Sequence, residues 1–60
     1  MDPAAIERHN QAIPYRNRAI ESQNQGDWAK AREALKECVD ALDDPDCVKE
    51  LQDLESRHRF

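Results

Sequence analysis

The sequence predicts an all-α fold of three helices in one small domain spanning residues 1–60. No run of residues alternates apolar and polar side chains or concentrates β-branched residues, so no strand is predicted. The chain has one glycine and three prolines, so each of these residues is informative about where helices start and end. In the middle of the chain apolar residues recur at helical spacing, at Trp28, Ala31, Leu35, Cys38 and Leu42.

The first helix is predicted over residues 3–24. Asp2 followed by Pro3 is typical of a helix start, because Asp caps the free backbone N–H groups and Pro fits the first turn. Gly26 can adopt the left-handed backbone conformation that ends a helix. Pro14 removes a backbone hydrogen bond inside this range, so we expect one helix kinked at Pro14 rather than two separate helices.

A seven-residue repeat runs through this helix. An apolar repeat of this length keeps one stripe of a helix facing one partner. His9 and Arg16 lie between successive isoleucines, where a strong coiled coil would place leucine, so the stripe is weak. Coincidence is the alternative, because there are only three repeats. The repeated residues are Ala5, Ala12 and Ala19, then Ile6, Ile13 and Ile20, then Asn10, Asn17 and Asn24.

The second and third helices are predicted over residues 28–42 and 45–57. Asp27 can cap the second helix with its carboxylate. Asp44 followed by Pro45 repeats the Asp-Pro start signal of the first helix. The apolar face of the third helix is formed by Cys47 or Val48, then Leu51, Leu54 and His58.

The predicted corner between the first two helices resembles the tetratricopeptide repeat (TPR). Asn24 to Trp28 resembles the turn of that family, and Ala31 with Leu35 resembles its Ala-x3-Phe pair. The resemblance covers about residues 12–45, with Arg18 and Ser22 where the family usually has apolar and aromatic side chains. It implies a TPR-like antiparallel hairpin, covered by the last helix, that binds proteins and is not a catalyst. The peptide-binding groove of the family needs several stacked repeats.

The charge distribution argues against nucleic acid as a partner. The net charge is −4, and residues 26–60 hold ten of the thirteen acidic residues and six of the nine basic ones. Phosphate contacts need clustered Lys and Arg. No segment reaches the length of a membrane span and no signal peptide is evident, so we expect no membrane partner and a cytoplasmic location.

The two cysteines do not have the paired spacing of a zinc site. Cys38 is expected to be a small core residue, with Cys47 near it at a helix start. A disulfide between them is geometrically possible, but it is the less favoured alternative in a reducing cytoplasm.

No cofactor, metal or catalytic residue is expected. The acidic cluster lacks the residue order of a calcium-binding loop, and helix capping explains it better. No nucleophile with a base and an orienting acid is evident, so we expect no enzyme activity. The acidic cluster consists of Asp40, Asp43, Asp44 and Asp46.

The sequence therefore indicates a non-enzymatic protein–protein interaction module that binds a partner or itself through apolar helix faces. A homodimer is the simplest form and a hetero-complex the other. The asparagines of the first helix either set register with that partner or form a solvated face. The expected partner-binding residues are Ile6, Ile13, Ile20, Asn10, Asn17, Trp28, Leu51 and Leu54.

Two other functions are open. The first is a small acidic inhibitor, of the kind that phages encode, occluding a basic or nucleic-acid-binding site on a target protein. The second is RNA binding by a helical dimer through Arg8, Arg16 and Arg18. Trp28 tests the architecture: if Val48 and Leu51 bury it, the third helix covers the hairpin, and if it is exposed it marks an interface.

Overall fold

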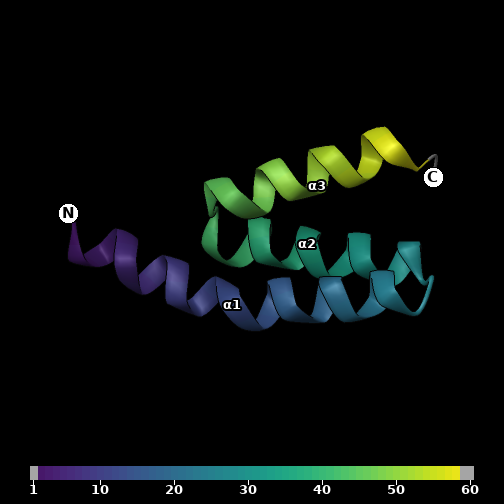
Figure 1. Ribbon diagram of the computed structural model, residues 1–60. Coiled ribbons are helices and arrows are strands. Elements are labelled where there is room, and N and C mark those ends of the chain that lie inside the picture. Colours follow the sequence, from purple (N-terminus) through teal and green to yellow (C-terminus); the bar gives the residue numbers. More distant parts are fainter. Residues whose placement is uncertain (1, 59–60) are drawn as a thin grey trace.

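The computed structural model describes residues 2–58, and these residues form three helices and no strand. The helices are α1 (Pro3–Asn24), α2 (Trp28–Leu42) and α3 (Pro45–Arg57), with the bounds that the sequence predicts. The all-α fold class is confirmed. α1 and α2 run antiparallel and side by side, and α2 packs against both α1 and α3 (Figure 1).

The corner between α1 and α2 is a Schellman motif. Gly26 has a φ of 76° and donates its backbone N–H to the carbonyl of Gln23 at 2.9 Å. Asp27 donates its backbone N–H to the carbonyl of Ser22 at 2.8 Å. These two bonds satisfy carbonyls that the end of α1 leaves without helical partners. The Asp27 carboxylate then accepts the Lys30 N–H at 3.1 Å, which starts α2.

The other helix starts are capped as the Asp-Pro signals predict. The Asp2 carboxylate accepts the N–H of Ala4 at 3.0 Å. Asp44 is buried, and its carboxylate accepts the N–H of Asp46 at 2.8 Å. Asp43, with a φ of 52°, ends α2 in the left-handed conformation and turns the chain toward α3.

α1 continues through Pro14 as one helix rather than two. A kink at Pro14 stays a prediction. The helix has 22 residues and α2 has 15, so the first turns of α1 extend beyond the other two helices (Figure 1). Ala5 is accordingly exposed, whereas Ala12 and Ala19 are buried against α2.

The core is thin and rich in alanine. One cluster lies near the corner, where Leu51 packs against it, and the other lies near the junction of α2 and α3. Small side chains on facing helices let the backbones approach closely. The first cluster consists of Ala19, Ala31, Ala34, Leu35 and Leu54. The second consists of Ala12, Cys38 and Cys47, with Tyr15, Val39 and Leu42 packed against them.

Cys38 and Cys47 form a disulfide, which is the less favoured alternative from the sequence. Both are fully buried, although the sequence predicts only Cys38 in the core, and their Cα atoms are 6.1 Å apart. The left-handed Asp43 followed by the extended Asp44 reverses the chain and brings the two cysteines within disulfide range. The disulfide joins the end of α2 to the start of α3.

Among the described residues, no helix combines the length and apolar character that a membrane span needs.

Candidate interaction surface

One side of α1 exposes its large apolar residues to solvent. Ile6, Ile13 and Ile20 are 45%, 42% and 52% exposed, although they are three of the few large apolar side chains in the chain. The asparagines of the repeat are exposed beside them. We define the outer face of α1 as these six residues: Ile6, Asn10, Ile13, Asn17, Ile20 and Asn24.

The seven-residue repeat explains why this face points outward. The alanine column packs on α2, with Ala12 and Ala19 almost fully buried. Each isoleucine follows an alanine by one position, which turns its side chain about 100° around the helix. The alanines allow the close approach of α1 to α2, and the isoleucines are left on the outside.

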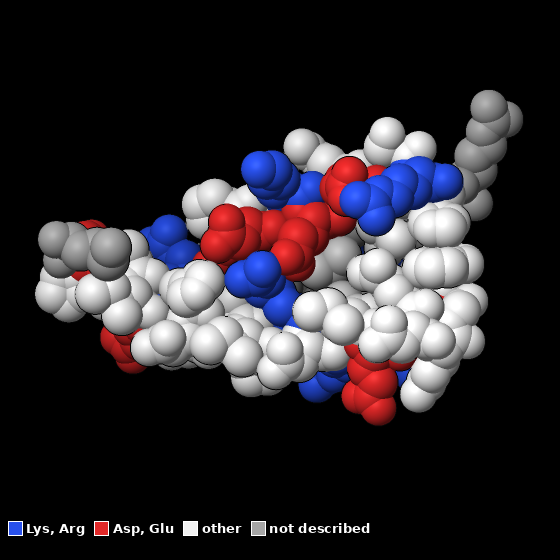
Figure 2. Space-filling view, viewed as in Figure 1, with Lys and Arg blue, Asp and Glu red and all other residues white. Residues whose placement is uncertain are grey.

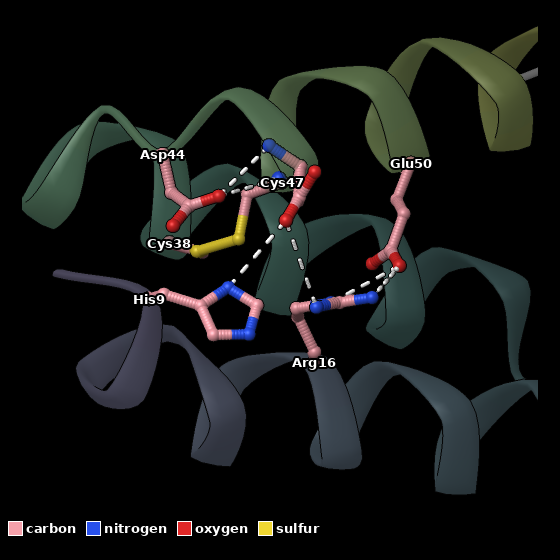
Figure 3. Close-up of polar contacts among 7 residues, drawn as sticks. His9, Arg16, Cys38, Asp44, Cys47 and Glu50 are labelled. Atoms are coloured by element: carbon pink, nitrogen blue, oxygen red, sulfur yellow. Dashed lines mark hydrogen bonds and ion pairs between the residues drawn. A yellow bond between two sulfur atoms is a disulfide. The ribbon is translucent and has the colours of Figure 1, made fainter. Parts of the chain in front are cut away.

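Polar side chains join α1 to α3 (Figure 3). Arg16 donates from Nε and Nη2 to Oε1 of Glu50, at 3.0 and 2.6 Å. Its Nη1 lies 4.0 Å from Oδ2 of Asp46, and His9 Nδ1 lies 3.5 Å from the same oxygen. The hydrogen bond to Glu50 raises the pKa of Arg16, and this outweighs the opposing effect of desolvation. These contacts link α3 directly to α1.

We call the contacts of His9 and Arg16 with Asp46 and Glu50 the polar bridge. The polar bridge changes the interpretation of the seven-residue repeat. The sequence places His9 and Arg16 in the apolar stripe, between the isoleucines, but the structure turns both toward α3 (Figure 3). The neighbours of the isoleucines on the outer face are the asparagines instead. The only sequence signal for the bridge is the pair Asp46 and Glu50, four residues apart on one face of α3.

Trp28 is covered in part. It is 37% exposed, and its ring stacks on His58 with the centroids 4.0 Å apart and the planes 19° from parallel. His58 is the C-cap of α3, so the end of α3 shields one side of the indole. The contact of Trp28 with the end of α3 is made by His58 and not by the expected Val48 and Leu51, and Trp28 counts among the exposed large apolar residues.

Leu51 and Leu54, the expected partner-binding residues of α3, pack inside the chain, and their role in binding stays a prediction. Leu54 is 4% exposed and belongs to the core cluster near the corner. Leu51 is partly buried against the same cluster. The apolar face of α3 is used inside the chain, because α3 needs it to pack on α2.

A shallow groove of about 210 Å³ lies between α1 and α3. Ile20 from α1 and Leu54 from α3 both line it, so it adjoins the outer face. Its volume is below the roughly 300–1,000 Å³ of small-molecule sites, so it is small for a ligand. Within residues 2–58, no group of three or more His, Cys, Asp or Glu side chains is placed to hold a metal ion.

In the view of Figure 2, the charged side chains gather mainly on α3. Figure 2 shows acidic and basic groups along α3 and at its boundary with α1, while the visible surface of α1 is mostly uncharged.

Comparisons with protein-family models, curated proteins and solved structures find no match to this chain. The TPR resemblance therefore stays a prediction from the sequence pattern.

Proposed function

We propose that this chain is a non-enzymatic interaction module that binds a protein partner through the outer face of α1. The observation that supports this proposal is the exposure of Ile6, Ile13 and Ile20 together on one face of one helix. Full burial of an isoleucine side chain stabilises by about 1.5–3 kcal/mol, and roughly half of each side chain is still available for burial. A partner that covers all three gains enough to offset part of the cost of association.

The asparagines suit the same role. Asn10 and Asn17 alternate with the isoleucines along the face, and their amides can donate and accept hydrogen bonds. Apolar side chains supply contact area in such an interface, and amides fix the position of the partner along the helix. The outer face therefore combines the two properties that a specific helix-binding surface needs.

The experiment is photo-crosslinking in the native cell. A photoreactive amino acid replaces Ile13 on the outer face, and in the matched control it replaces Lys36, an exposed residue of α2. We expect adducts with a protein from position 13 and few from position 36. Equal labelling from both positions, or none from position 13, would contradict the proposal.

The acidic-inhibitor alternative rests on the excess of acidic residues in residues 26–60. It predicts the opposite pattern, with adducts from position 36. When the crosslinking is repeated in a lysate of the same cell, these adducts should decline as added salt screens the charges. Apolar contacts of the outer face should be insensitive to the same increase in ionic strength.

A further inference from the structure

The six residues of the outer face have the spacing of a coiled-coil interface. Successive steps from Ile6 to Asn24 are alternately four and three residues long. This alternation corresponds to the d and a positions of a heptad, with isoleucine at every d and asparagine at every a. All six residues are exposed, and the whole interface lies on the side of α1 away from the buried alanines.

We propose that the partner of the outer face is a second copy of this chain, paired through α1 as a parallel two-stranded coiled coil in register. This inference rests on the proposed function and names its partner. In the parallel arrangement each layer pairs like with like, isoleucine on isoleucine and asparagine on asparagine. In the antiparallel arrangement a positions meet d positions, so every amide would face an isoleucine and lose its hydrogen-bond partner.

Charge also favours pairing through α1. Within residues 3–24 there are two acidic and three basic residues, whereas residues 26–60 have ten acidic and six basic ones. Two copies joined through α1 therefore bring their nearly neutral surfaces together and keep their acidic helices outside. Pairing through α2 or α3 would bring together two surfaces that each have an excess of acidic residues.

One reciprocal ion pair follows from the parallel register. Arg16 is at a g position and Glu21 at an e position of the following heptad, so Arg16 lies beside the partner's Glu21. Arg16 also donates two hydrogen bonds to Glu50 of its own chain, so the pair with the partner's Glu21 is a secondary contribution to the interface. The two-fold symmetry repeats this pair. Since the face spans only three heptads, the dimer should be weak and depend on protein concentration.

The test compares two variants that add the same charge to the same helix. Asn17→Asp places two carboxylates opposite each other in the proposed dimer, whereas Gln11→Glu, also exposed, lies off the outer face. Sedimentation equilibrium on the full chain should show a dimer at high concentration. We expect Asn17→Asp to raise the dissociation constant about tenfold or more, because like charges meet at close range. Gln11→Glu should leave it unchanged, and acidic pH should restore the Asn17→Asp dimer.

Orientation is measured separately with pyrene attached to the N-terminal amine. A parallel pair brings the two labels together and gives excimer emission, whereas an antiparallel pair separates them by a helix length of about 33 Å. A monomer at every concentration, an equal effect of the two variants, or a dimer without excimer would each overturn the inference. A monomer whose position 13 still crosslinks to a different protein would overturn this inference and leave the proposed function supported.

Discussion

α1 and α3 both pack against α2, but α1 presents small apolar side chains to it and α3 presents large ones. α3 turns its large apolar residues inward, with Leu54 buried and Leu51 packed against the same cluster. α1 turns alanines inward and leaves its isoleucines 42–52% exposed. Both helices have large apolar residues, yet only α3 uses them inside the chain.

This difference predicts that the large apolar residues of α3 matter for stability and that those of α1 matter for binding. The apolar residues of α3 contribute to the core and cannot be removed without loss of packing. The isoleucines of α1 contribute little to the core, so core packing does not account for their recurrence every seven residues. Three ways of changing the molecule test this comparison.

The largest effect is expected from truncating the inward face of α3. Leu54→Ala should lower the free energy of unfolding by about 2–4 kcal/mol, because it removes a buried side chain and leaves a cavity. Ile13→Ala on the outer face should cost less than about 1 kcal/mol. Urea denaturation at a concentration where the protein is monomeric measures both. Similar losses for the two variants would erase the distinction between the helices.

Loss of the disulfide should lower the free energy of unfolding slightly less than Leu54→Ala does. Replacing both Cys38 and Cys47 by alanine opens a loop of sequence separation 9, which corresponds to about 2–3 kcal/mol of stability. A domain of 60 residues has roughly 3–9 kcal/mol in total, so this loss is large. Denaturation with and without reductant measures it, and the double variant serves as the control that reductant does not affect. A wild-type chain with free thiols and no response to reductant would contradict the bond.

The smallest effect is expected at the polar bridge. Arg16 and Glu50 are 29% and 34% exposed, so a double-mutant cycle with Arg16→Met and Glu50→Gln should give a coupling of about 0.5–1 kcal/mol. The matched cycle at Arg18 and Glu37, which are 56% and 53% exposed and 3.4 Å apart, should give less. Equal couplings would show that the bridge does not hold α3 against α1 more firmly than a surface pair.

The helix bounds could be predicted because local chemistry determines them. Asp2, Asp27 and Asp44 each accept a backbone hydrogen bond at the helix start they were expected to cap. Gly26 has the positive φ that its position requires. These signals act over three or four residues, so they can be recognised without knowledge of the fold.

The packing could be predicted only in part. Alanine and isoleucine repeat with the same period in α1, and periodicity alone does not tell which column faces α2. The direction of His9 and Arg16 depends on Asp46 and Glu50, which lie more than thirty residues away in sequence. The disulfide depends on the left-handed conformation of Asp43, a conformation uncommon for a residue other than glycine.

The first turns of α1 extend beyond the other two helices (Figure 1). A helical segment of this length is not stable in water without tertiary contacts. Its amide protons should therefore exchange faster than those around Ala12 and Ala19, which are buried. A partner therefore meets the more stable part of the helix at Ile13 and Ile20, and contact with Ile6 should stabilise the first turns of α1 as the complex forms. Binding at the start of α1 should therefore also stabilise the helix there, whereas binding around Ile13 and Ile20 should not change the stability of the helix.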